Sequence, residues 1–426
     1  MSTQVMAGRA ELFPRALPTR LTSRIGLLGC GNVGTELVRL IRQRPDAELS
    51  IERALVRRPR PAGHESDIPF TTSPHAVLAG APDVVVELLG GCEPARELLL
   101  AALERGIPVV TANKSLLARH GRELRDASRR TAVPLLYEAA VIAGVPFLGT
   151  FARRPLAADA SALTGIVNGT SNFILSQSAR CSIDAAEALR EAQARGYAER
   201  DPANDINGTD AAEKLAVLLQ HFAARDVPVE TLERAGIDGI LLRHHTLASA
   251  LGGVIKPVVH ADWTNGIEAF VGPAFVPAAH PLHTVDGVEN ALLLETARGR
   301  LLFQGPGAGP AVTAATVLDD VEEVVRGSVA AGSPALSGAA VHAPLTGWLI
   351  ALDAPRLPAH VELAEYFAAH GVYIQRATDK HTRDGRERQG LLTWPVPGRV
   401  VRDALAGVQS AAGVNWIVLR ALESGR

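Results

Sequence analysis

The sequence contains few cysteines, few aromatic residues and almost no net charge. Its three cysteines, Cys30, Cys92 and Cys181, lie far apart and so form neither a disulfide framework nor a metal-binding pattern. This sparse usage favours a reducing, cytoplasmic setting. A formal net charge of −2 gives no general attraction for nucleic acid or for an anionic membrane, so neither is expected as a partner.

Long apolar runs are also missing. No uninterrupted stretch of about eighteen apolar residues occurs, so no membrane-spanning helix is expected. The first twenty residues lack the central apolar segment of a secretory signal, and residues 1–23 are predicted to be an N-terminal extension. With 426 residues, of which 47% are apolar and 21% charged, the chain suits two or three globular domains.

A glycine-rich turn follows a short apolar strand near the start of the chain. Residues 24–28 are predicted to form the strand and residues 35–41 a helix, with Gly29, Gly31 and Gly34 between them in a GxGxxG pattern. Gly29 permits a tight turn, Gly31 lets the backbone approach a pyrophosphate, and Gly34 lets the helix pack on the strand. The free N–H groups at the start of the helix would face the anion.

This turn opens an alternating series of strands and helices. The series predicts an α/β fold, with a Rossmann-type doubly wound parallel sheet in a dinucleotide-binding domain at residues 24–146. The further strands are expected at 51–56, 83–89, 108–111 and 134–137, and the later helices at 95–105 and 116–129.

The end of the second strand bears on the choice of cofactor. A site selective for NAD usually has an acidic residue there, but this strand ends in Arg57 and Arg58, and Glu52 lies too early. Two arginines suit a ribose 2′-phosphate, so NADP is favoured or at least accepted. Two solvated surface arginines are the equally open alternative.

Two further strand ends carry candidate site residues. Gly90 and Gly91 end the third strand, at the edge of the sheet where cofactors bind. Lys114 follows the fourth strand, where its ammonium group could meet a carboxylate or an alcohol of a substrate. A solvated lysine is the alternative for Lys114.

The segment 196–218 concentrates charged groups on a loop and the start of a helix. Asp210 and Lys214 are four residues apart on the helix, so their side chains point the same way. Glu199 on the preceding loop is expected to reach the same point. Two carboxylates and one ammonium group suit a small zwitterion and leave the lysine as a proton carrier. The alternative is an ordinary exposed ion pair, with Asp210 or Thr209 capping the helix.

The rest of the chain divides by composition. Residues 147–305 are predicted to form an α+β substrate and dimerisation domain, and residues 327–344, rich in Gly, Ser, Ala and Pro, a linker. Residues 345–426 follow a βαββαβ order, which is typical of a ferredoxin-like unit. Its elements are expected at 347–352, 360–370, 372–376, 389–394, 399–409 and 416–421.

Several motifs together resemble those of the homoserine dehydrogenase family, over nearly everything after residue 23. Besides the glycine-rich turn, they are TANK at 111–114, YEAA at 137–140, GIVNGTSN at 165–172, GYAERDP at 196–202 and GPGAG at 305–309. The resemblance implies an NAD(P)-dependent enzyme that interconverts L-aspartate 4-semialdehyde and L-homoserine in threonine, methionine and isoleucine biosynthesis.

The resemblance also implies roles for single residues. Lys214 matches the proposed acid–base lysine and Lys114 a second essential lysine, while Glu199, Asp210 and Thr170 match substrate-site positions. Glu138 and the backbone carbonyls of Val141, Ala143 and Val145 match a sodium-binding loop. The cofactor contacts are expected at Gly29, Gly31, Asn32, Val33, Gly34, Arg57, Arg58, Gly90, Gly91, Lys114 and Gly309.

Larger-scale expectations follow from the same resemblance. Residues 306–326 would return to the nucleotide-binding domain, and the enzyme would be a homodimer or a homotetramer. The C-terminal unit resembles the ACT regulatory module, which binds amino acids such as threonine. Its loop 353–358 lacks the usual proline–glycine pair, so a pairing module without an effector stays open.

The proposed acid–base lysine raises a question of charge. Asp210 would raise the pKa of Lys214, whereas Lys114 and desolvation in a closed cleft would lower it, and we expect the latter to win once substrate binds. A water held by Lys214 and Asp210 is an alternative proton carrier. Two other functions stay open: an oxidoreductase for another amino-acid semialdehyde, and a catalytically silent amino-acid sensor.

Overall fold

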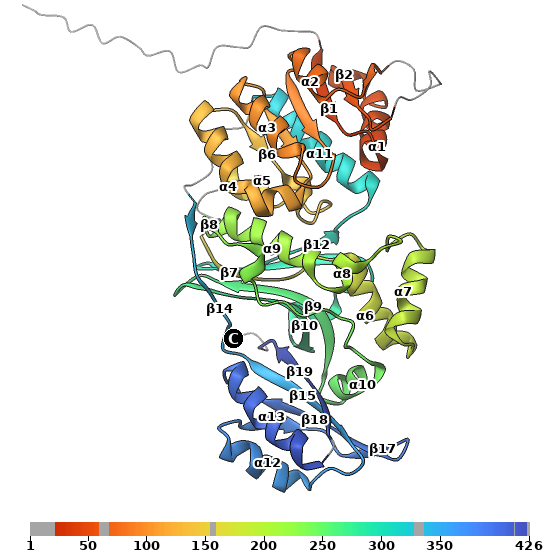
Figure 1. Cartoon of the computed structure of the whole chain (residues 1–426), viewed down its shortest axis with the longest axis vertical. Helices are drawn as coiled ribbons and strands as arrows, with labels where there is room; N and C mark the ends of the chain where they lie inside the picture. Colours follow the sequence, from red (N-terminus) through yellow and green to blue (C-terminus); the bar gives the residue numbers. More distant parts are fainter. Residues whose placement is uncertain (1–21, 59–67, 154–158, 328–335, 413, 424–426) are drawn as a thin grey trace, which may run out of the picture.

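The computed structural model describes residues 22–58, 68–153, 159–327, 336–412 and 414–423. Most of the expected N-terminal extension and residues 328–335 of the expected linker lie outside these ranges. The molecule is elongated, with a parallel sheet at one end, a mixed sheet in the middle and a smaller unit at the other end (Figure 1). No helix in the described ranges combines the length and the apolarity needed to cross a membrane.

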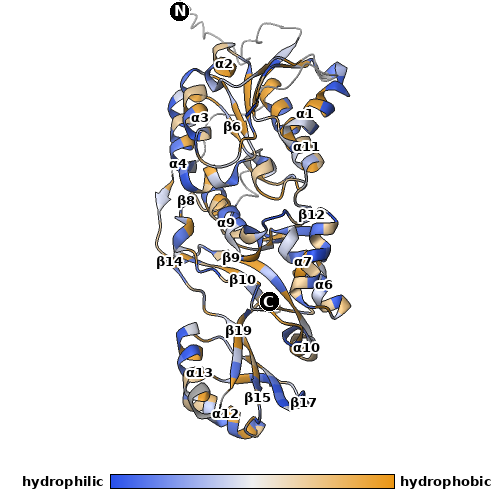
Figure 2. Cartoon of the chain, turned by 45° about the vertical axis from the view of Figure 1, so that its right-hand side comes forward, coloured by the Kyte–Doolittle hydropathy of each residue, from blue (hydrophilic) through white to orange (hydrophobic). Residues whose placement is uncertain are grey.

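The first tier is a six-stranded sheet in which every pairing is parallel. Its order, β3-β2-β1-β4-β5-β6, is that of a dinucleotide-binding fold, so the predicted Rossmann-type sheet is confirmed. Short apolar strands such as β4 form here because helices cover both faces of the sheet, and orange, apolar segments are visible in this part of the molecule in Figure 2. They are β1 (Ser23–Leu28), β2 (Leu49–Leu55), β3 (Phe70–Thr71), β4 (Val84–Glu87), β5 (Val109–Thr111) and β6 (Leu135–Leu136).

One helix of this tier comes from a distant part of the sequence. Helix α11 (Pro310–Val325) packs against α1 (Asn32–Arg42), and its Ala314 and Val317 share a hydrophobic cluster with Ile25 (Figure 1). The other helical segments of this part of the chain are η1 (Pro45–Ala47), α2 (Pro74–Ala79), α3 (Ala95–Glu104), α4 (Lys114–Thr131), η2 (Glu138–Ala140) and α5 (Leu148–Arg153).

The second sheet runs through the middle and the far end of the molecule. Its main path has the order β12-β11-β7-β9-β10-β19-β15-β18-β16. The strands of the middle part are β7 (Ala160–Ile166), β9 (Gly253–Asp262), β10 (Ile267–Pro277), β11 (Glu289–Thr296) and β12 (Gly299–Pro306). The sequence pattern predicts strands at 163–167, 267–271 and 291–296, which correspond to parts of β7, β10 and β11, and it predicts neither β9 nor β12.

Helices separate the middle sheet from the first tier. In α9 (Thr209–Phe222), Leu215, Leu218 and Leu219 are fully buried, and their spacing places them on one apolar face of the helix. The remaining helical segments are α6 (Gly169–Cys181), α7 (Ala185–Ala194), α8 (Ala203–Ile206), η3 (Val229–Thr231), α10 (Leu242–Ala250) and η4 (Pro281–Thr284).

Part of the predicted linker is ordered against other strands. Strand β13 (Ser337–Gly338) pairs with β8 (Arg225–Asp226), and β14 (Val341–His342) pairs with β10. These residues of the predicted linker therefore pair their backbone groups with neighbouring segments.

Apart from one additional short strand, β17, the C-terminal unit has the predicted βαββαβ order, and its four main strands pair in the antiparallel order β19-β15-β18-β16. Trp348, Ile350 and Leu352 of β15 pack with Phe367 of α12, whereas Leu349 packs with the middle tier. Because side chains alternate along a strand, β15 is buried on both faces. The elements are β15 (Gly347–Ala354), α12 (His360–Ala369), β16 (Ile374–Ala377), β17 (His381–Arg383), β18 (Arg386–Thr393), α13 (Gly398–Ala412) and β19 (Asn415–Ala421).

Candidate active site

The candidate site lies where the first tier meets α9 of the middle tier. Lys114 is the first residue of α4, and Asn113 caps this helix by accepting a hydrogen bond from the Leu116 amide at 3.1 Å. The Asn113 side chain also donates to the Gly91 carbonyl at 2.6 Å. The cap therefore ties the start of α4 to the glycine pair at the next strand end.

Glu87, which the sequence analysis did not single out, organises the same edge of the sheet. It ends β4, is fully buried, and accepts hydrogen bonds from the Thr111 hydroxyl at 2.6 Å and the Asn113 amide group at 3.3 Å. Its carboxylate also accepts from the backbone amides of Leu89 and Gly90. Burial raises the pKa of Glu87. A glutamate inside a valine run is a signal that sequence reasoning could have used.

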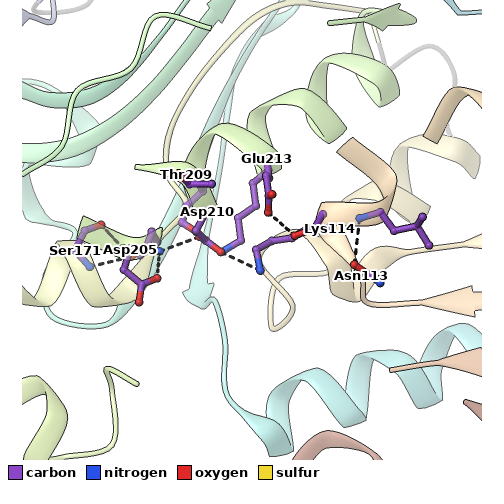
Figure 3. Close-up of polar contacts among 12 residues, drawn as sticks. Asn113, Lys114, Ser171, Asp205, Thr209, Asp210 and Glu213 are labelled. Atoms are coloured by element: carbon purple, nitrogen blue, oxygen red, sulfur yellow. Dashed lines mark hydrogen bonds and ion pairs between the residues drawn. The ribbon is translucent and has the colours of Figure 1, made fainter. Parts of the chain in front are cut away.

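Asp210 joins two lysines from different tiers. Its Oδ2 lies 2.9 Å from Lys214 Nζ, one turn along α9, and its Oδ1 lies 3.1 Å from Lys114 Nζ (Figure 3). Lys214 Nζ also donates to the Val167 carbonyl at 2.7 Å. Asp210 and Lys214 are each only 8% exposed, which excludes the alternative of an ordinary exposed pair. The helix is capped by Gly208 rather than by Thr209 or Asp210.

A second carboxylate, that of Asp205, is linked to Asp210 through the side chain of Asn168. The Asn168 side-chain amide donates to Asp205 Oδ1 at 2.7 Å and to Asp210 Oδ2 at 2.8 Å. Its oxygen caps α6 by accepting from the Ser171 amide at 2.8 Å. The Glu199 side chain is exposed and makes no hydrogen bond or ion pair with Asp210 among the described residues.

The loop that carries Glu199 is nevertheless tied to the site. The Thr170 hydroxyl donates to the Tyr197 carbonyl at 2.8 Å, and the Gln193 side chain donates to the Glu199 carbonyl at 3.2 Å. Thr170 thus connects the start of α6, which Asn168 caps, to the loop that carries Glu199. Glu199 itself lies at the surface.

The electrostatics of the cluster follow from its two ammonium groups. Burial opposes ionisation of Asp210, but the charges of Lys214 and Lys114 outweigh it and hold the pKa of Asp210 well below its ordinary value. Burial would lower the pKa of Lys114, but Asp210 and, more weakly, Glu213 and Asp205 raise it above its ordinary value. Burial raises the pKa of Asp205. Lys114 is therefore a firmly charged ammonium group.

The glycine-rich turn has the geometry that its pattern predicted. Gly29 has a φ of +105°, and a Cβ there would lie 2.7 Å from the Leu88 carbonyl oxygen. A Cβ on Gly34 would lie 2.5 Å from the Gly29 carbonyl oxygen, which explains why the helix can pack so closely. A Cβ on Gly31 would meet no heavy atom within 4 Å, so this backbone is open to a ligand. Gly31 is the N-cap residue of α1, whose first residues are Asn32 and Val33, and no side chain caps the helix.

The other predicted cofactor positions are also open. A Cβ on Gly90, Gly91 or Gly309 would meet no heavy atom within 4 Å, and each has a positive φ. Arg57 and Arg58 follow β2 and are exposed. This arrangement fits a dinucleotide that runs over the glycine turn and along the edge of the sheet.

The predicted sodium loop is a tightly bonded joint. Glu138 accepts hydrogen bonds from three successive backbone amides, at 2.7, 2.9 and 2.6 Å, and the Ala143 carbonyl accepts from the Thr316 hydroxyl. The carbonyls of Val141 and Val145 receive no hydrogen bond from the described residues. Two free carbonyl oxygens fit a hard monovalent cation. The described ranges contain no group of three or more His, Cys, Asp or Glu side chains placed for a metal ion.

Comparison with known proteins gives consistent results. A family profile described as homoserine dehydrogenase matches residues 146–321, and one described as homoserine dehydrogenase, NAD binding domain, matches residues 29–138. A homoserine dehydrogenase of Corynebacterium glutamicum is 36% identical over 397 residues, which cover 87% of this chain and 88% of that one.

Two further proteins match over almost their whole length. A homoserine dehydrogenase of Pseudomonas aeruginosa is 32% identical over 425 residues, covering 93% of this chain and 98% of its own. The crystal structure of a homoserine dehydrogenase from Thiobacillus denitrificans superposes with a TM-score of 0.84 at 32% identity, covering 95% of this chain and 99% of that one.

Proposed function

The chain belongs to the homoserine dehydrogenase family and is an oxidoreductase that interconverts L-aspartate 4-semialdehyde and L-homoserine; from this premise, we propose that Lys214 and Lys114 handle the proton and the charge of the reaction. Reduction of the aldehyde adds a hydride to carbon and a proton to oxygen. A bound nicotinamide cofactor supplies the hydride, or accepts it in the reverse direction.

The single observation that carries this proposal is the set of contacts of Lys214. An ammonium group has three protons to donate, and two of them are used by Val167 and Asp210. The third is free for the substrate oxygen, and the fixed partners orient it. Lys214 can then give a proton to the oxygen as the aldehyde is reduced and take it back from the alcohol. A water between Lys214 and Asp210 would serve the same purpose.

The remaining charges suit the two ends of an amino-acid substrate. Lys114 is partly exposed, with 33% of its side chain accessible, and it remains charged, so we assign it the substrate carboxylate or the reacting oxygen. Asp210 is already neutralised by two lysines. Asp205 and the exposed Glu199 are therefore the carboxylates better placed for the substrate ammonium group, with Thr170 beside them.

Replacement of Lys214 tests the assignment. Lys214→Met is expected to lower kcat by roughly a hundredfold or more, the usual size of a lost acid–base contribution, while cofactor binding is retained. Turnover is followed by the absorbance of the reduced nicotinamide, and cofactor binding by its fluorescence. Lys380→Met is the matched control, because Lys380 likewise donates to backbone carbonyls and pairs with a carboxylate, that of Glu387, but lies in the C-terminal unit. Near-normal kcat in Lys214→Met would refute the proposal.

We further propose that the enzyme accepts NADP through Arg57 and Arg58. Two observations support this proposal: both arginines are exposed after β2, and no acidic residue stands at the end of that strand. The double variant Arg57→Ala/Arg58→Ala should raise KM for NADP about tenfold or more, the cost of lost phosphate contacts, and leave KM for NAD unchanged. An equal change for both cofactors would show that the arginines are surface residues.

We propose that the carbonyls of Val141, Ala143 and Val145, with Glu138 beside them, hold a sodium ion. The free carbonyls of Val141 and Val145 support this, whereas the Ala143 carbonyl must share its oxygen with Thr316. Sodium chloride should then raise the melting temperature more than choline chloride at the same ionic strength. Identical melting curves in the two salts would remove sodium from the account.

The larger assembly is also proposed. We assign residues 24–146 with 306–326 to nucleotide binding, 147–305 to substrate binding and pairing, and 345–426 to an ACT-like regulatory unit. The shared hydrophobic cluster of α1 and α11 supports the first, and the βαββαβ order the last. Light scattering should give a homodimer or a homotetramer rather than a monomer. Millimolar threonine should lower the rate, and unchanged rates would argue for a pairing module without an effector.

A further inference from the structure

Glu213 connects the helix that carries Lys214 to the helix that carries Lys114. It precedes Lys214 on α9 and is only 5% exposed. Its Oε2 accepts a hydrogen bond from the Ser115 hydroxyl at 2.6 Å, and its Oε1 lies 2.6 Å from Arg119 Nη1. Ser115 directly follows Lys114 on α4, so each partner in this contact is the immediate chain neighbour of one of the two lysines. Figure 3 shows Glu213 close to Lys114.

The geometry of α4 explains why one carboxylate reaches both partners. Ser115 and Arg119 are four residues apart and therefore lie on the same face of α4. Further along, the two helices pack very closely, since a Cβ on Gly121 would lie 2.4 Å from the side-chain oxygen of Gln220. Gln220 also donates to the Leu117 carbonyl at 3.1 Å. The Glu213 contacts thus fix the end of the helix pair where both lysines emerge.

We propose that Glu213 is a positioning residue, which holds the start of α4 against α9 so that the ammonium groups of Lys114 and Lys214 can share Asp210. This inference rests on the roles proposed above for the two lysines. The two ammonium groups come from different tiers and repel each other, so an anchor close to both is needed to keep them within about 3 Å of one carboxylate. A displacement of about 1 Å at such a site can cost a large factor in rate.

Glu213 also acts on Lys114 through its charge. Its carboxylate is one of the groups that raise the pKa of Lys114, after Asp210, while burial opposes both. Asp205 adds a smaller contribution of the same sign. Loss of the Glu213 charge should therefore lower the pKa of Lys114 and move any alkaline limb of the rate profile that depends on it to lower pH.

The test replaces the carboxylate by its neutral isostere. Glu213→Gln is expected to lower kcat roughly tenfold, consistent with a small displacement of a reacting group, and to move the alkaline limb to lower pH. Cofactor affinity should stay within about twofold of the wild-type value, because the direct partners of Glu213 are Ser115 and Arg119 and not the glycines or arginines predicted to hold the cofactor. Glu213→Asp, which keeps the charge, should retain more activity than Glu213→Gln.

Glu123→Gln is the matched control. Glu123 lies on α4 and, like Glu213, pairs with an arginine, here Arg96 at 2.7 Å, but it belongs to the outer surface of the first tier. The kcat and the pH profile of Glu123→Gln should equal those of the wild type. The inference fails if Glu213→Gln behaves like Glu123→Gln, or if its loss of rate is matched by an equal loss of cofactor affinity.

A double variant separates this inference from the proposed function. If Glu213 acts through Lys114, Glu213→Gln should cost little further kcat in a Lys114→Met background. If Lys114→Met alone has normal kcat, the proposed role of Lys114 fails and the inference with it. If Lys114→Met is impaired and Glu213→Gln lowers its kcat by the full single-variant factor, only the inference about Glu213 fails.

Discussion

Asn168 keeps two carboxylates of the active site in place with a single amide group. Its Nδ2 bridges Asp205 and Asp210, while its oxygen caps α6 through Ser171. Asn168→Asp keeps an oxygen that can cap α6, but it replaces the amide donor between Asp205 and Asp210 by an oxygen of a third carboxylate. We expect kcat to fall roughly tenfold at neutral pH, the equivalent of one unit of pKa in the cluster, and to recover partly as a proton returns at lower pH.

The measurement is a pH–rate profile of Asn168→Asp against the wild type. Asp184→Asn serves as the control, because Asp184 also caps a helix, α7, by accepting from the Glu187 amide at 2.8 Å, but lies away from the lysines. A profile for Asn168→Asp that matches the control would mean that the bridge is unimportant for turnover.

At this scale the sequence predicted what local geometry determines. The spacing of Asp210 and Lys214 fixes their common direction, and this was visible without a structure. The place of Asp205 was not, because it depends on Asn168, which is distant in sequence, and on the contact of Ile206 with the Ile237 amide. The sequence analysis instead names Glu199 as the second carboxylate, because a loop has no periodicity from which the direction of its side chains can be inferred.

Among the elements, the glycine turn before α1 separates folding from ligand binding. Gly34→Ala would press a methyl group to 2.5 Å from the Gly29 carbonyl oxygen, whereas Gly31→Ala would add one in open space. Gly34→Ala should destabilise the protein by about 1–3 kcal/mol, the usual cost of overpacking. Gly31→Ala should melt like the wild type but bind the dinucleotide more weakly.

Thermal unfolding and a cofactor titration of both variants check this prediction. Each variant is the control for the other, since the chemical change is the same. Wild-type dinucleotide affinity in Gly31→Ala would show that the pyrophosphate does not pass there, and wild-type melting of Gly34→Ala would show that α1 can move to accommodate the methyl group.

The elements that the sequence predicted were those whose burial is simple. The strands of the parallel sheet are short apolar runs, and α9 has a clear apolar stripe. Strand β9 was missed because Lys256 and Pro257 interrupt its apolar run, and β12 because it lies largely exposed at an edge. Lys256 is tolerated inside because it donates to the Val285 carbonyl and pairs with Asp286.

At the scale of the whole molecule, α10 packs between the middle tier and the C-terminal unit with an unsatisfied histidine. His245 is 7% exposed, and neither ring nitrogen has a hydrogen-bond partner among the described residues. Burial, and then the charge of Lys256, lower its pKa to about 4. In the unfolded chain His245 therefore binds a proton below pH 6.5, whereas in the folded protein it stays neutral down to about pH 4. The free energy of unfolding falls as pH falls from 6.5 toward 4.

His245→Leu should remove this loss. The variant should gain stability over the wild type as pH falls below 6.5, by up to about 1.4 kcal/mol per pH unit. Urea unfolding at pH 5 and pH 8 measures the difference, with His381→Leu on the exposed β17 as the control. A gain of the same size at both pH values would mean that the proton balance of His245 does not contribute.

The sequence predicted the three parts of the molecule better than their connection. Composition and element order indicated a parallel sheet, a mixed layer and a βαββαβ unit, because each follows from local patterns. That the last two share one sheet was not foreseen. Their junction consists of two residue pairs, Ala274–Arg420 and Phe275–Ala421, and no local pattern encodes a pairing across so long a separation.

That junction has a consequence for shortened chains. The outer edge of β10 is covered in pieces, by β14, by the bridge from Arg234 and by β19. A protein cut before residue 345 would lose the last of these and leave bare N–H and C=O groups beside Phe275. Unpaired backbone groups at a strand edge can pair with a strand of another chain. The truncated enzyme should therefore aggregate in solution even with every catalytic residue present.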